Sequence, residues 1–181
     1  VMRPLHLSLF LALIIPAGLF AQVKSQDPPK EPLPKPISKP EKTATKKILF
    51  IGNSFTFWRG GLDQHLKMLS EAMSPPLGYE TNSVTRGGAS LEGMWKKTSA
   101  VEEIKKGQYD IVILQDDIPE TTIDSFKTYS KKFVDLVRES GARPILFMAW
   151  DYERLNWISM EEIANAHLEV SRKLKVEIAP V

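Results

Sequence analysis

The chain has 181 residues, of which 43% are hydrophobic and 25% charged, a composition typical of one globular domain. Its formal net charge is only +2, and nothing in the distribution of charge indicates a nucleic-acid partner. The chain contains no cysteine, which excludes a disulfide framework, a thiolate metal site, a cysteine nucleophile and a cysteine-linked lipid anchor.

The N-terminus has the pattern of an export signal. Arg3 and His6 precede an apolar run over residues 7–20, and small Ala21 then precedes polar Gln22. The run is shorter than the roughly 20 apolar residues that a membrane span needs. We therefore predict that residues 1–21 are a signal peptide and that the protein is secreted or periplasmic. The alternative is an uncleaved N-terminal anchor. A membrane enters these expectations only through this segment.

Residues 22–46 interleave prolines with lysines and hold little apolar surface, which predicts a linker. From Lys47 onward the pattern is that of one folded domain, residues 47–181. Apolar runs there alternate with stretches of helical periodicity. The strands are predicted at residues 48–51, 79–85, 109–114, 144–150 and 176–181, and the helices at 62–73, 123–137 and 159–174.

The predicted strands are apolar on both faces, as in a parallel sheet that helices cover on each side. The sequence therefore predicts an α/β protein with a flavodoxin-like, three-layer fold. Its five-stranded parallel sheet has helices on both faces. Ligands of such sheets bind beyond the carboxyl ends of the strands, so the residues that follow each strand are the informative ones.

Three strand ends carry candidate chemistry. Gly52, Asn53 and Ser54 follow the first strand, where a serine near the start of a helix is either a reactive hydroxyl or a helix cap. Gly88, after the second strand, has a backbone N–H that could donate to an oxyanion, although an ordinary glycine turn explains it too. Gln115 ends the third strand as a candidate side-chain donor. The alternative there is a solvated loop in which Asp117 caps a helix.

Together, these three blocks resemble the SGNH hydrolase superfamily, the GDSL-like esterases and lipases. Gly52-Asn53-Ser54 is similar to that family's Gly-Asp-Ser block, with Asn in place of Asp. The resemblance implies that Ser54 is the nucleophile and that Gly88 donates its N–H to the oxyanion. The third block departs from the usual Gly-x-Asn-Asp, and Gln115 is our choice for its donor, with Asp117 second. We expect the residues that bind substrate to be Asn53, Trp58, Asp117 and Asp151.

The family's last block, Asp-x-x-His, has no counterpart in this sequence. The chain has three histidines, of which His6 lies in the predicted signal peptide. His65 and His167 lie on apolar helix faces, which favours packed imidazoles. We therefore expect that the chain is truncated before this block and that it is nearly inactive as given, because a serine nucleophile needs a base.

The function predicted from these residues is a serine esterase acting on a small-molecule or carbohydrate ester, such as an acylated carbohydrate. It needs no cofactor and no metal. The first alternative is a non-catalytic carbohydrate-binding module or pseudoenzyme on the same fold. The second is a flavin- or nucleotide-binding domain, which no glycine-rich phosphate fingerprint supports. The sequence does not indicate an oligomeric state.

Overall fold

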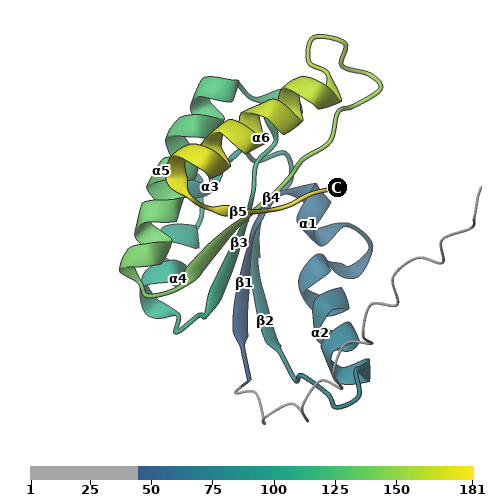
Figure 1. The fold of residues 1–181 in the computed structure, drawn as a ribbon, viewed down its shortest axis with the longest axis vertical. Coiled ribbons are helices and arrows are strands. Elements are labelled where there is room, and N and C mark those ends of the chain that lie inside the picture. Colours follow the sequence, from purple (N-terminus) through teal and green to yellow (C-terminus); the bar gives the residue numbers. More distant parts are fainter. Residues whose placement is uncertain (1–44) are drawn as a thin grey trace, which may run out of the picture. The chain divides into compact units, whose positions relative to one another are not determined.

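The computed structural model describes residues 45–181, so the predicted signal peptide and nearly all of the predicted linker lie outside the described residues. A five-stranded, wholly parallel sheet forms the centre of the fold (Figure 1). Its strand order, β2-β1-β3-β4-β5, confirms the flavodoxin-like prediction. The strands are β1 Lys47–Gly52, β2 Glu80–Thr85, β3 Ile111–Gln115, β4 Arg143–Phe147 and β5 Glu177–Ala179.

Helices cover both faces of the sheet, as Figure 1 shows, with α1 and α2 on one face and α3 to α6 on the other. Right-handed crossovers between parallel strands require this division, because the chain moves first toward β2 and then back across β1 toward β5. The elements are α1 Ser54–Phe57, the 3₁₀ turn η1 Trp58–Gly60, α2 Leu62–Ala72, α3 Leu91–Lys97, α4 Ala100–Lys106, the 3₁₀ turn η2 Ile118–Glu120, α5 Ile123–Glu139 and α6 Met160–Leu174.

The main core lies between the sheet and the α3–α6 face. Leu49 and Ile51 of β1 are fully buried there, together with Phe126 and Phe133 of α5. The two edge strands differ from this centre. β2 is polar and has no buried residue, in contrast to the predicted strands with two apolar faces, and β5 is only three residues long. The buried centre of the sheet is therefore what fixes the positions of the strand ends that carry the candidate site.

Local signals in the sequence place the ends of the last helices. Gly141 adopts φ +84 after α5, and the N–H groups of Gly141 and Ala142 donate to the carbonyls of Arg138 and Val137, a Schellman motif. Ser159 and Glu162 form a capping box at the start of α6.

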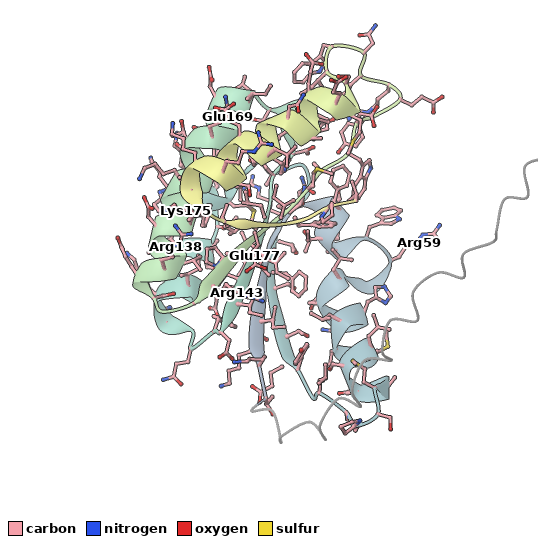
Figure 2. The ribbon with its side chains drawn as sticks, in the orientation of Figure 1. Arg59, Arg138, Arg143, Glu169, Lys175 and Glu177 are labelled. Atoms are coloured by element: carbon pink, nitrogen blue, oxygen red, sulfur yellow. The ribbon has the colours of Figure 1, made fainter. Side chains whose placement is uncertain are left out.

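Two side-chain contacts tie the C-terminal elements to their neighbours. The Arg138 guanidinium donates to the carbonyl of Lys175 at 2.9 Å, and Arg143 pairs with Glu177 at 3.2 Å (Figure 2).

Several elements differ from the predictions. No helix was predicted between the second and third strands, yet α3 and α4 lie there. Their signal was the recurrence of apolar residues from Leu91 through Ile104, interrupted by Gly93, a poor helix former. The strand predicted at 144–150 is Arg143–Phe147, because both of its neighbours, β3 and β5, end at the residues that pair with Phe147. No helix among residues 45–181 is both long and apolar enough to cross a membrane.

The buried imidazole of His167 makes acid pH destabilising. His167 is fully buried against Phe126, its Nδ1 contacts the Ile163 carbonyl at 2.8 Å, and its Nε2 has no partner within the described part of the chain. Burial lowers the pKa of His167. As the pH falls below the unfolded value near 6.5, the unfolded chain takes up a proton that the folded state resists, so stability falls.

We expect His167→Leu to lose less of its melting temperature than the wild type between about pH 7.5 and about pH 5.5. Thermal unfolding followed by circular dichroism at both pH values measures this difference. Val170→Ala, which removes buried apolar volume from the same helix, serves as the control, and it should lower the melting temperature equally at both. An equal pH response in His167→Leu and the wild type would contradict this assignment.

Candidate active site

The turn after β1 presents Ser54 with its hydroxyl unused. Asn53 is the N-cap of α1, and its Oδ1 accepts from the N–H of Phe55 at 3.0 Å. The capping role considered for the serine is therefore filled by its neighbour. Ser54 is half-buried, and neither its hydroxyl nor its N–H has a hydrogen-bond partner within residues 45–181. Both groups are thus available to a ligand.

The amide of Gln115 holds this turn against the sheet. Gln115 is 1% exposed, and its Oε1 accepts from the N–H of Asn53 at 3.0 Å and from the hydroxyl of Thr56 at 3.3 Å. Gly52 lies so close that a Cβ built on it would stand 2.8 Å from the same oxygen. Gln115 Nε2 donates to the carbonyl of Asp116. These contacts make Gln115 a positioning residue, and its predicted role as an oxyanion donor stays a prediction.

Hydrogen bonds join the loop after β2 to the residues at the ends of β1 and β3. The N–H of Arg86 donates to the carbonyl of Gly52 at 3.1 Å, and Asn53 Nδ2 donates to the carbonyl of Ala89 at 3.3 Å. From β3, Asp116 Oδ2 accepts from the N–H of Leu91 at 2.7 Å. Gly88 sits inside this clamp with φ +61, and its N–H has no partner in the described part of the chain.

Two carboxyls lie at the end of β3 in unlike surroundings. The pKa of Asp116 is raised to about 7, chiefly by burial; the N–H of Leu91 acts in the opposite direction, and the nearby Asp117 adds to the rise. One oxygen of Asp116 has no hydrogen-bond partner among the described residues. Burial also raises the pKa of Asp117, while the hydroxyl of Tyr152, which donates to it at 3.1 Å, acts in the other direction.

A pocket of about 500 Å³ opens beside Ser54. The ring of Phe55 stacks on that of Trp150 with centroids 3.9 Å apart, while Trp58 is 69% exposed. Aromatic walls with a few polar groups are typical of ligand sites. The pocket is lined by Ser54, Phe55, Trp58, Arg59, Leu62, His65 and Trp150.

The four predicted substrate-binding residues have different places. Trp58 lines the pocket with Ser54. Asn53 is fully buried and both ends of its amide are used within the protein, and its role in substrate binding stays a prediction. Asp117 is also buried, and it accepts from Tyr152 and caps no helix through its side chain. Asp151 is exposed and forms no hydrogen bond or ion pair within residues 45–181.

The arginine and the histidine of the pocket were not among the predicted site residues. His65, expected to be packed, is exposed, and its Nε2 contacts the carbonyl of Arg59 at 2.9 Å. Arg59 has a left-handed backbone, φ 52, followed by two glycines that also have positive φ. The Gly60-Gly61 pair after Trp58-Arg59 was the only signal in the sequence for such a tight turn.

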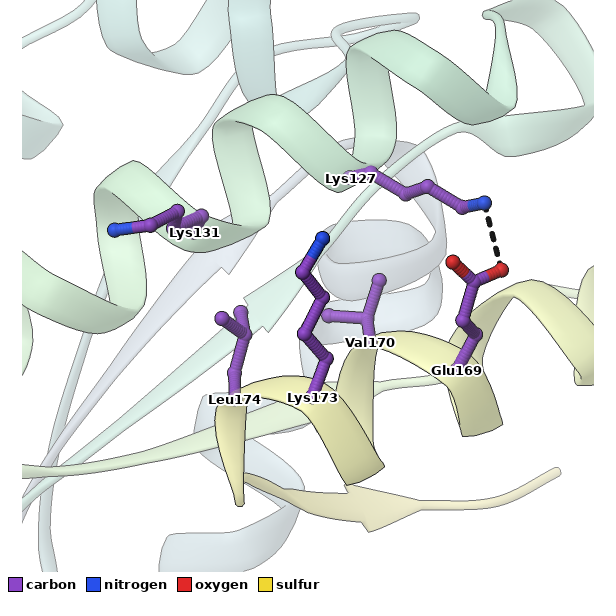
Figure 3. Close-up of a pocket in the computed structure, with 6 residues that line it drawn as sticks. All are labelled: Lys127, Lys131, Glu169, Val170, Lys173 and Leu174. Carbon is purple, nitrogen blue, oxygen red and sulfur yellow. Dashed lines mark ion pairs between the residues drawn. The ribbon is translucent and has the colours of Figure 1, made fainter.

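A second hollow lies between α5 and α6, far along the chain from Ser54 (Figure 3). It holds only about 50 Å³ and is lined mainly by lysine stems. Lys127 pairs with Glu169 at 2.6 Å across it. Its size suits little more than a water molecule, so we assign it no site.

We expect Gln115→Ala to destabilise the protein by about 2–4 kcal/mol, because it strands the buried N–H of Asn53 and hydroxyl of Thr56. Urea unfolding measures the loss. Gln64→Ala is the matched control, since the Gln64 amide is exposed, and it should change stability by less than about 0.5 kcal/mol. Similar losses in the two variants would show that the amide of Gln115 does not hold the turn.

The Asp116 carboxyl predicts a pH dependence of opposite sign to that of His167. Its folded pKa of about 7 exceeds the unfolded value, so stability is fully present below about pH 4 and falls as the pH rises toward 7, by roughly 4 kcal/mol at most. Asp116→Asn should remove this slope and raise the melting temperature at pH 8 relative to the wild type. Asp151→Asn, at an exposed carboxyl, is the control. A slope that survives in Asp116→Asn would contradict the assignment.

Solved structures with a similar fold were found by comparison, whereas no protein-family model and no curated protein matches the sequence. A protein from Slackia heliotrinireducens that is described as an SGNH hydrolase is 21% identical, with a TM-score of 0.59 over 75% of this chain and 79% of that chain. A variant of Axe2, an acetyl-xylooligosaccharide esterase from Geobacillus stearmophilus, is 14% identical with a TM-score of 0.58, over 76% and 77%. The esterase EstA from Pseudoalteromonas sp. is 10% identical with a TM-score of 0.62, over 75% and 77%. The chain therefore has the fold of the SGNH hydrolases.

Proposed function

We propose that this protein is an exported hydrolase of ester bonds that uses Ser54 as its nucleophile. The observation that carries the proposal is the free hydroxyl of Ser54 at the carboxyl end of β1, beside an aromatic pocket and with the capping role taken by Asn53. Parallel sheets bind their ligands at this edge. The likeness of the fold to solved esterases supports the same reaction class.

The reaction follows from the groups at this edge. Ser54 Oγ attacks the acyl carbon, and the carbonyl oxygen takes up the negative charge. The N–H groups of Ser54 and Gly88 hold that oxyanion, and Gln115 is the candidate third donor. The bond to the alcohol then breaks, the alcohol leaves with a proton, and water releases the acyl group from the serine in a second step.

The base is the part of this mechanism that the described histidines do not supply. His167 is fully buried, and neither His167 nor His65 forms a hydrogen bond with Ser54 within residues 45–181. We propose that a base from outside these 181 residues completes the site, and that the chain by itself hydrolyses esters slowly. The substrate we propose is an acylated carbohydrate, because exposed aromatic rings such as Trp58 provide flat apolar surfaces on which sugar rings stack.

A second candidate function is a binding module without catalysis. The aromatic pocket can serve ligand binding as well as turnover, and the observation that favours a binding module is that Ser54 has no hydrogen bond to a histidine within residues 45–181. The two functions differ in whether Ser54 forms a covalent bond with the acyl group. That difference is measurable in this chain even when its base is missing, because a small base added to the solution can take the place of the missing side chain.

We expect the full chain to hydrolyse 4-nitrophenyl acetate slowly, and added imidazole to raise the Ser54-dependent rate several-fold by acting as the missing base. Release of nitrophenolate measures the rate, and the rate of Ser54→Ala under the same conditions is subtracted. Ser159→Ala is the matched control, because Ser159 caps α6 at another place in the fold and its loss should leave the rate unchanged.

Each outcome of this experiment decides between the proposals. A Ser54-dependent rate that added imidazole does not raise supports the hydrolase and contradicts the proposal that its base is missing. Equal rates in the wild type and Ser54→Ala, with and without imidazole, contradict the hydrolase in this chain and favour the binding module.

A further inference from the structure

Among residues 45–181, Arg59 is the one arginine or lysine that lines the Ser54 pocket, and no aspartate or glutamate of this range lines it. Within the described part of the chain, the Arg59 guanidinium forms no ion pair and no hydrogen bond. Figure 2 shows its side chain extending into solvent from the segment between α1 and α2, in contrast to Arg138 and Arg143, which contact neighbouring elements. Its charge is therefore available to a ligand at the pocket rim.

The backbone at Arg59 is held in a conformation that favours glycine. Its φ of 52 and ψ of 42 lie in the left-handed region, which is unfavourable for a residue with a side chain. The carbonyl of Arg59 can only accept, so the Nε2 of His65 at 2.9 Å must carry the hydrogen of this contact. The contact fixes the turn. A strained residue held in place at a candidate site points to a function for its side chain.

The charge and the walls of the pocket together define a ligand. A guanidinium binds a carboxylate through a charge-assisted, forked pair of hydrogen bonds. Arg59 is the single arginine or lysine among the described residues of the pocket lining, and one cation matches one negative charge better than the two of a phosphate monoester. Phe55, Trp58 and Trp150 offer flat apolar surfaces to a ring.

We propose that Arg59 makes this pocket selective for esters that carry a carboxylate on a ring, with the ring against the aromatic walls and the carboxylate on the guanidinium. This inference rests on the proposed function, since it names the substrate class of the same site. The proposed step is binding alone, and the ester bond stays intact in it. Arg59 is a specificity residue, and His65 is a positioning residue that acts through the Arg59 carbonyl.

The test measures binding to the full chain carrying Ser54→Ala, in which the proposed nucleophile is absent. The probes are 4-acetoxybenzoate and 4-acetoxybenzamide, which have nearly the same shape and differ in the charge of one group. Quenching of tryptophan fluorescence reports binding, because Trp58 and Trp150 line the pocket. We expect the benzoate to bind about tenfold more tightly, equivalent to about 1.4 kcal/mol, and the preference to shrink at high salt.

Variants of Arg59 separate recognition from structure. Arg59→Gln should reduce the preference for the benzoate to within twofold and leave the affinity for the benzamide unchanged. Arg59→Gly should do the same while keeping or raising the melting temperature, because glycine adopts positive φ without strain. His65→Gln can still donate to the carbonyl and should keep more of the preference than His65→Ala. Lys67→Gln, which removes an exposed charge of α2 outside the pocket lining, is the control and should keep it all.

Two results would overturn the inference: equal affinities for the two probes in the parent chain, or a preference that persists in both Arg59→Gln and Arg59→Gly. Neither result bears on turnover of 4-nitrophenyl acetate, which has no carboxylate. Conversely, a chain that fails to hydrolyse that ester can still show the charge preference. Failure of the inference and failure of the proposed function are therefore distinguishable.

Discussion

The hydrogen bonds that Gln115 Oε1 accepts from the Asn53 N–H and the Thr56 hydroxyl join the first helical turn to the middle of the sheet. The geometry of the candidate site depends on this buried amide. Asn53 passes the restraint on, since its side chain caps α1 at one end and holds the carbonyl of Ala89 at the other. The positions of Ser54 and of the Gly88 turn are therefore both set by Gln115, whose close packing in the core resists small displacements.

The same edge of the sheet concentrates groups that are costly to bury. Asp116 and Asp117 lie side by side in the chain, and burial works against the charge of both. The protein offsets part of this cost with the N–H of Leu91 and the hydroxyl of Tyr152. A carboxyl that is partly neutral near pH 7 keeps the loop after β2 in place without a full buried charge. The buried carboxyls therefore lower the stability of the fold, while their hydrogen bonds fix the arrangement of the loops.

Most of the fold and part of the candidate site could be predicted from the sequence. Alternating apolar strands and amphipathic helices predict a parallel, doubly wound sheet because few topologies satisfy right-handed crossovers. The strand-end rule was enough to single out Ser54 and Gly88. The rule does not give the direction in which a side chain points. It therefore could not show that Asn53 is buried, or whether the amide of Gln115 holds the turn or donates to an oxyanion. Arg59 and His65 escaped it because they meet through a left-handed turn, whose geometry no periodic pattern encodes.

The polar character of β2 and the shortness of β5 affect how the molecule behaves beside other copies of itself. Edge strands with free backbone groups are templates on which chains aggregate when the strands are long, flat and apolar. Here one edge consists largely of Glu80, Thr81, Asn82 and Ser83, and the other ends after three residues. Neither offers an attractive surface for lateral growth. Variation in what the protein recognises is then left to the loops at the carboxyl edge, which can lengthen or change sequence while the sheet beneath them stays the same.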